Sequence, residues 1–107
     1  MRTLIIAGAT AATLSMATSL RAAGVTVDQS GQQFSEKTLS INHGDTITFA
    51  NKDDVSHNIT VVDDSDDAVD LGLQKPGESL SHAFGKDGKF KIRCSIHPSM
   101  KMTVTVK

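Results

Sequence analysis

After residue 24, apolar and polar residues alternate with a period of two in nearly every apolar segment. The clearest pairs of apolar positions are Leu39 and Ile41, Ile47 and Phe49, and Val104 and Val106. Successive side chains of a strand point to opposite faces, so this period predicts strands with one buried face and argues against helices. Turn-forming sequences separate the segments, at 43–45, 51–54, 76–77 and 86–88. The pattern predicts an all-β fold, a sandwich of short strands.

The N-terminal residues have the order of a secretory signal. Arg2 supplies a positive charge, a stretch of apolar and small residues runs from Leu4 to Ala17, and small residues occur again before Val25. This stretch is too short and too rich in Ala and Thr to span a bilayer. We expect residues 1–23 to be an export signal to the periplasm, with the cleavage position left open. An ordinary N-terminal helix is the alternative.

The domain that remains after export is small. Removing residues 1–23 from the chain of 107 leaves 84 residues, which suffice for one domain, residues 24–107. A core of this size usually needs a disulfide or a metal, and Cys94 is the only cysteine. A lone thiol is a liability in an oxidising compartment unless it is buried or bound to metal. The sequence therefore favours a metal site that includes Cys94.

The charge balance excludes one class of function. Loss of Arg2 and Arg21 reduces the 11 basic residues to nine against 12 acidic ones, and the chain has four Phe but no Tyr or Trp. An acidic domain without such aromatic residues is not expected to bind nucleic acid. Five aspartates between Asp63 and Asp70 predict an exposed connection. An acidic docking patch for a basic partner is the functional alternative for this stretch.

Strand parity directs two potential metal ligands into the core. Cys94 shares a face with Phe90 and Ile92, whereas the cations at positions 89, 91 and 93 share the opposite face. His57 lies in the same way on the face of Ile59 and Val61. We therefore expect Cys94 at the end of one strand and His57 at the start of another to point inward.

The residues after Cys94 add two more donors. Residues 94–100 read C-x-x-H-x-x-M, so that one short loop offers Cys94, His97 and Met100. Thiolate and thioether suit Cu(I), and imidazole suits both oxidation states of copper. Two His, one Cys and a weak Met form the ligand pattern of blue-copper electron-transfer sites. The predicted metal ligands are His57, Cys94, His97 and Met100, and the predicted cofactor is one type 1 copper ion.

These motifs resemble the cupredoxins, the blue copper proteins, over the span from about Gly24 to Lys107. The resemblance rests on the His57-Asn58 pair, the approach F-x-I-x-C at 90–94, His97-Pro98 and Met100, and on the segment GDTITFAN at 44–51. The short ligand loop is most similar to that of the amicyanins. The resemblance implies a small Greek-key β-sandwich. It also implies equatorial ligation by His57, Cys94 and His97 and axial ligation by Met100. A hydrogen bond between Asn58 and the backbone or hydroxyl of Ser95 is implied as well.

Three positions depart from this family pattern, and several alternatives stay open. Ile96, Met102 and Ile92 stand where the pattern has a proline, a glycine and often an aromatic residue, which leaves the ligand set intact. Met102 is the alternative axial ligand, although its parity with the final valines favours the core. His43 and His82 are expected at the surface, and a second copper site at either would favour copper trafficking.

We expect a carrier of single electrons and not an enzyme, because four protein donors leave no coordination position for a substrate. The expected partner is a protein redox partner that binds transiently, and the expected state is a monomer without a membrane-spanning segment after signal removal. The alternative function is copper tolerance, sequestration or delivery through the same site.

Overall fold

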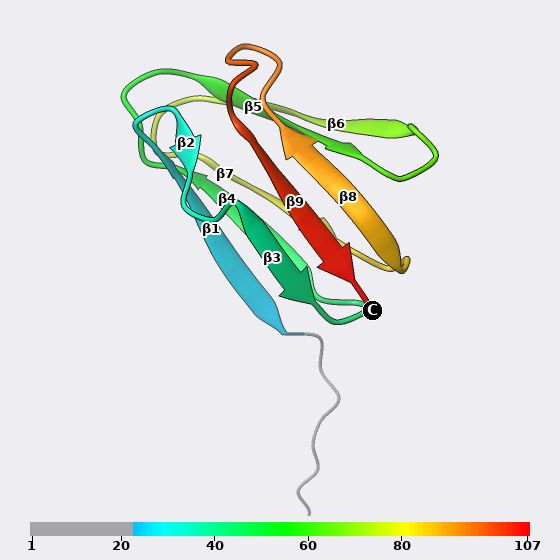
Figure 1. Cartoon of the computed structure of the whole chain (residues 1–107). Helices are drawn as coiled ribbons and strands as arrows, with labels where there is room; N and C mark the ends of the chain where they lie inside the picture. Colours follow the sequence, from blue (N-terminus) through cyan, green and yellow to red (C-terminus); the bar gives the residue numbers. More distant parts are fainter. Residues whose placement is uncertain (1–22) are drawn as a thin grey trace, which may run out of the picture.

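The structure is a computed structural model that describes residues 23–107 (Figure 1). Its strands are β1 (Gly24–Ser30), β2 (Gln33–Phe34), β3 (Thr38–Ile41), β4 (Thr46–Asn51), β5 (His57–Val62), β6 (Ala68–Gln74), β7 (Ser79–Ala83), β8 (Gly88–Arg93) and β9 (Lys101–Val106). The expected export signal lies outside the described residues, apart from Ala23. Within residues 23–107, the structure contains no helix long and apolar enough to cross a membrane.

The strands form two layers. One sheet has the order β2-β1-β4-β7 and the other the order β3-β9-β8-β5-β6. The chain passes between the sheets at five connections, from β2 to β3, from β3 to β4, from β4 to β5, from β6 to β7 and from β7 to β8. Two neighbouring pairs, β1 with β4 and β3 with β9, run parallel, and the other pairs are antiparallel. The predicted all-β sandwich is thus confirmed.

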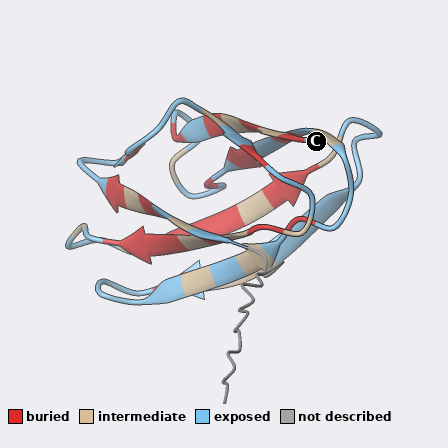
Figure 2. Ribbon diagram, turned by 90° about the horizontal axis from the view of Figure 1, so that it is seen from below, coloured by how far each residue is buried: buried red, intermediate tan, exposed pale blue. Residues whose placement is uncertain are grey.

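The core lies between the two sheets and follows the predicted alternation. Buried residues alternate with exposed or half-buried ones along β8 and β9. The strands carry most of the buried residues and the connections are mostly exposed (Figure 2). Val27, Ile47 and Phe49 from one sheet are fully buried, as are Ile59 and Ile92 from the other. Removing such side chains from water contributes about 1.5–3 kcal/mol each. Burial of one face of strands such as β8 and β9 helps to fix the register of the sheets.

The register of the five-stranded sheet brings distant segments to one end of the sandwich. β5 and β8 pair antiparallel, with Thr60 opposite Arg93, so the start of β5 and the end of β8 lie together. β8 and β9 also pair antiparallel, and residues 94–100 join them at this end (Figure 1). We call residues 94–100 the ligand loop.

The acidic stretch differs in part from the expected exposed connection. Residues 63–67 form a turn in which the Asp63 carboxylate accepts hydrogen bonds from the backbone N–H groups of Ser65 and Asp67. Asp70, however, lies within β6. The hydrogen bonds from Asp67 and Ser65, and the contact with Lys86, outweigh slight desolvation and lower the pKa of Asp63. Asp63 therefore has a structural role in shaping this turn.

Candidate metal centre

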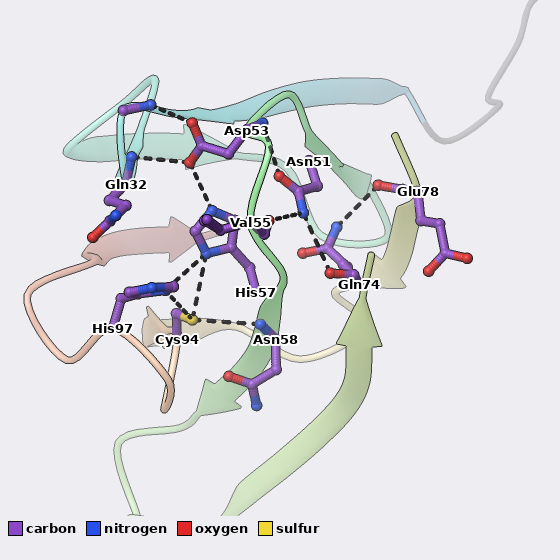
Figure 3. A network of polar contacts seen from close by, with 11 residues as sticks. Gln32, Asn51, Asp53, Val55, His57, Asn58, Gln74, Glu78, Cys94 and His97 are labelled. Atoms are coloured by element: carbon purple, nitrogen blue, oxygen red, sulfur yellow. Dashed lines mark hydrogen bonds and ion pairs between the residues drawn. The ribbon is translucent and has the colours of Figure 1, made fainter. Parts of the chain in front are cut away.

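Three of the four predicted ligands converge at the end of the sandwich. The side chains of His57, Cys94 and His97 point toward one another (Figure 3). The Nδ1 atoms of the two histidines are 3.0 Å apart, and the Cys94 Sγ is 3.8 Å from each of them. Within the described residues, this is the one group of at least three His, Cys, Asp or Glu donors close enough to hold a metal ion.

The separations fit a metal ion placed between the three atoms. Zinc, an ion of about the size of copper, lies about 2.0–2.1 Å from an imidazole nitrogen and about 2.3 Å from a thiolate sulfur in proteins. In a trigonal arrangement such distances separate nitrogen and sulfur by about 3.8 Å. Both N–S separations in the structure match this value, while the N–N separation corresponds to a somewhat smaller angle at the ion. The donor set and its geometry therefore fit copper.

Strand geometry explains why His57 and Cys94 meet. His57 is the first residue of β5 and is fully buried, on the same face as Ile59 and Val61. Cys94 follows β8 directly and is also fully buried. Because β5 and β8 are neighbours in the same sheet, both side chains point into the space between the sheets at the same end. The parity prediction for these two residues is confirmed.

The ligand loop is closed by its own backbone. The Met100 N–H donates to the His97 carbonyl at 2.8 Å, and the Cys94 N–H donates to the Met100 carbonyl at 3.2 Å. Met100 is buried at the end of the loop. Met102, by contrast, lies within β9 opposite Ile92 and belongs to the hydrophobic core. This placement favours Met100 over Met102 as the fourth donor.

Asn58 ties the two ligand segments together, as the family resemblance implies. Its Oδ1 accepts hydrogen bonds from the Ser95 N–H at 2.6 Å and the Ser95 hydroxyl at 3.0 Å. The Asn58 backbone N–H also points at the Cys94 Sγ, at 3.4 Å. This backbone donor holds the sulfur in place beside the start of β5.

Asp53 is part of the site, although its sequence position predicts only a turn. Its carboxylate lies 2.7 Å from the Nε2 of His57 and also accepts hydrogen bonds from the backbone N–H groups of Gly31 and Gln32 (Figure 3). An N–H at Nε2 leaves the Nδ1 of His57 unprotonated and free to bind metal. Partial desolvation raises the pKa of Asp53, but these hydrogen bonds outweigh it, so that the pKa lies below its ordinary value.

Asn51 holds the segment that carries Asp53. Its Nδ2 donates to the carbonyls of Val55 and Gln74, at 2.9 and 3.3 Å, and its Oδ1 accepts from the Asp53 N–H at 2.9 Å. The side chain is buried, so these bonds are protected from water. Residues 51–55 are thereby fixed against β6, which sets the position of the Asp53 carboxylate beside His57.

The two histidines of the site differ in exposure. His57 is fully buried, whereas His97 is half-buried in the ligand loop. The residues on either side of His97 are exposed, and Ile96 retains 48% of its surface. The His97 side of the site is therefore the side nearer to solvent.

The remaining histidines lie apart from this site. His43 is exposed and pairs with the Asp87 carboxylate at 2.7 Å, as expected for a surface residue. His82, expected at the surface, is half-buried in β7, and its ring packs nearly perpendicular to the ring of Phe84. Desolvation lowers the pKa of His82. Neither residue belongs to a second group of three donors among residues 23–107.

Comparison with known sequences identifies two similar curated proteins. The methylamine utilization protein MauL of Methylophilus methylotrophus is 34% identical over 79 residues, which are 72% of this chain and 45% of that protein. The protein of the same name from Methylorubrum extorquens is 31% identical over 68 residues, 64% of this chain and 60% of that protein. The chain thus spans about half the length of these curated relatives.

Similar solved structures are cupredoxins. A reduced amicyanin variant aligns with a TM-score of 0.72 and 26% identity, over 78% of this chain and 82% of that chain. A purple cupredoxin from Nitrosopumilus maritimus aligns with a TM-score of 0.69 and 26% identity, over 78% of this chain and 99% of that chain. The family model of copper binding proteins, plastocyanin/azurin family, matches residues 21–107. With its sandwich fold and its copper-fitting donor set, this chain belongs to the plastocyanin/azurin family of copper-binding proteins.

Proposed function

We propose that His57, Cys94, His97 and Met100 bind one copper ion, and that the protein carries single electrons between redox partners in the periplasm. The observation that carries the proposal is the convergence of one sulfur and two imidazole nitrogens from separate segments on a space that fits the ion. The similarity to amicyanin and to methylamine utilization proteins supports a redox role. The sequence features of an export signal support the location.

Copper bound here would supply a Cu(I)/Cu(II) couple, for which these ligand types are suited. The protein has to hold the ligands in nearly the same place in both oxidation states. The hydrogen bond between Asn58 and Ser95 restrains the ligand loop, and the hydrogen bond between Asp53 and His57 restrains the start of β5. Ligands that are held in this way reorganise little on oxidation, so that little energy opposes electron transfer.

The half-buried ring of His97 is the proposed route for the electron. Its neighbours Ile96 and Pro98 are exposed and apolar, so a redox partner can approach this side of the site closely. A small apolar contact suits a brief encounter, as electron-transfer complexes require. Four protein donors leave no position for a substrate, so we propose a carrier and not an enzyme.

Copper loading of the purified protein tests the proposal. We expect one equivalent of Cu(II) to give an intense visible thiolate-to-copper band and a reversible one-electron couple. Cys94→Ser should abolish the band, because Cys94 is the only thiolate of the chain. Ser99→Ala, which changes an exposed residue of the same loop, is the matched control and should keep the band.

Two outcomes would contradict the proposal. A coloured Cys94→Ser protein would refute the ligand assignment. A wild-type protein that binds copper but has no reversible couple, and that releases the ion readily to a chelator, would support copper delivery or sequestration in place of electron transfer.

A further inference from the structure

Five cations gather on the outer face of the five-stranded sheet. Lys89, Lys91 and Arg93 alternate along β8 as exposed residues, Lys101 begins β9, and Lys37 precedes β3. The Thr103 N–H donates to the Lys37 carbonyl at 3.0 Å, which fixes this lysine beside β9. We call these five residues the basic face.

The basic face is hollowed. Four of its members line a groove of about 490 Å³ together with Met102 and Thr103; the four are Lys37, Lys91, Arg93 and Lys101. Arg93 and Lys101 stand directly opposite each other on paired strands. Among the residues that the structure describes, none of the five cations forms an ion pair with an acidic side chain.

This concentration of charge is unfavourable for folding by itself. Arg2 and Arg21 precede the described residues, which leaves nine of the 11 basic residues in the domain, and five of these nine lie on the basic face. Like charges directly opposite on neighbouring strands destabilise a sheet. The domain is acidic in total, so the face is not the result of a basic composition. An acidic surface bound to it would relieve the repulsion.

The basic face begins at the metal centre. Arg93 directly precedes Cys94, and Lys101 directly follows Met100, so this opposed pair of cations stands at the base of the ligand loop. From there the face continues along β8 to Lys89, away from the loop (Figure 1). A partner that binds the face is therefore held close to the ligand loop.

We propose that the basic face docks an acidic protein surface, that of the redox partner, with its carboxylates in the groove beside the ligand loop. This inference rests on the proposed electron-carrier function. A protein surface fits better than a nucleic acid or an anionic membrane, because Asp63, Asp64 and Asp66 line an adjoining hollow with Lys89 and Lys91. An extended polyanion would be repelled by these carboxylates. A protein surface can present acidic groups to the basic face and basic groups to the carboxylates.

Binding of a defined acidic probe tests the docking face. An octaglutamate peptide is titrated into the ¹⁵N-labelled Cu(I) protein at low ionic strength, and chemical-shift changes give the site and the dissociation constant. We expect the changes to concentrate on β8, the start of β9 and Lys37. Lys91→Glu with Arg93→Glu should weaken binding by about tenfold or more, because two attractions become repulsions. About 0.3 M salt should also weaken binding.

The control is a pair with the same change of net charge off the basic face, Lys75→Glu with Lys107→Glu. Both are exposed, one after β6 and one after β9, and this variant should bind octaglutamate much more tightly than the variant with the altered face. Equal losses in the two variants would overturn the proposal, because net charge alone would then explain binding. Stronger binding of the wild type to duplex DNA or to phosphatidylglycerol vesicles than to octaglutamate would also overturn it.

The docking face and the carrier function can fail separately. The titration needs no electron transfer, and the visible band and couple of each variant are recorded on the same samples. Loss of the couple with intact octaglutamate binding would refute the carrier function alone. A normal couple without binding at the basic face would refute the docking face alone.

Discussion

A single carboxylate, that of Asp53, connects the buried histidine of the metal centre to another part of the fold. It accepts a hydrogen bond from the His57 ring and two from the turn between β1 and β2. Its side chain is only 11% exposed, so the negative charge acts on the site with little screening by water. Asp53 therefore orients His57 and also places a charge near the copper position.

We predict that Asp53→Asn lowers copper affinity by about 10–100-fold, the usual effect of losing a partner of a histidine ligand. The reduction potential should rise, because loss of a nearby negative charge disfavours Cu(II) more than Cu(I). Competition with a chelator and cyclic voltammetry measure the two effects.

Asp54→Asn is the matched control, since Asp54 is an exposed neighbour and the change of charge is the same. This control should keep the affinity and most of the potential of the wild type. Equal effects of the two variants would mean that the contact between Asp53 and His57 does not matter for the metal.

The directions of side chains in or next to strands could be predicted from the sequence, whereas those in turns could not. Cys94 and His57 were predictable as ligands because strand parity directs both side chains into the core and both are donors that suit copper. Asp53 was not predictable as part of the site, because a turn has no periodicity from which the direction of a side chain follows. The outward direction of Lys91 and Arg93 also follows from parity. Their proximity to Lys37 does not, because it depends on the parallel pairing of β3 with β9.

The ligand loop and β9 divide the two methionines of the domain between them. Met100 ends a loop whose backbone bonds join Cys94, His97 and Met100, whereas Met102 is part of a regular strand. Both side chains are buried, so burial alone does not distinguish a ligand from a core residue. The distinction follows from the element in which each residue lies.

We predict that Met100→Leu keeps the visible band but raises the reduction potential, because the weak axial donor that stabilises Cu(II) is lost. Met102→Leu should leave the potential nearly unchanged and reduce the free energy of unfolding by less than about 1.5 kcal/mol, as for other swaps of similar volume. Voltammetry and denaturant unfolding check both variants. A raised potential in Met102→Leu with an unchanged one in Met100→Leu would reverse the assignment.

The alternation of apolar residues predicted the sandwich and strands such as β3, β4 and β9. It did not predict that β1 pairs with β4 and β3 with β9 in parallel. Such pairings join segments that are distant in the sequence, and the pattern of a single strand carries no information about its neighbour. The assignment of the acidic stretch to one exposed connection was wrong in part for the same reason, since Asp70 belongs to β6 and pairs with Thr60 of β5.

The domain as a unit has a small core and no disulfide, with Cys94 as its one free thiol. Copper that binds only the folded form raises the free energy of unfolding. The gain grows with the logarithm of the ratio of the free copper concentration to the dissociation constant. At a thousandfold excess over that constant the gain is about 4 kcal/mol. The ion is then a substantial part of the stability of a domain of this size.

We predict that the copper form melts about 15–30 °C above the apo form at such an excess, since 1 kcal/mol shifts the melting temperature of a small domain by about 4–8 °C. Calorimetry of the two forms measures the difference. Cys94→Ser measured with and without copper is the control and should show a much smaller shift. Equal melting temperatures for the two wild-type forms would mean that the site does not form as described.

Three of the four proposed ligands come from seven consecutive residues, and the fourth, His57, is anchored in the sheet by its neighbours and by Asp53. One side of the metal centre is thus the sheet itself, and the other is a single stretch of chain joined at both ends to strands. Release of the ion should begin at the half-buried His97, on the side nearer to solvent, so that the fully buried His57 is the last histidine to let go.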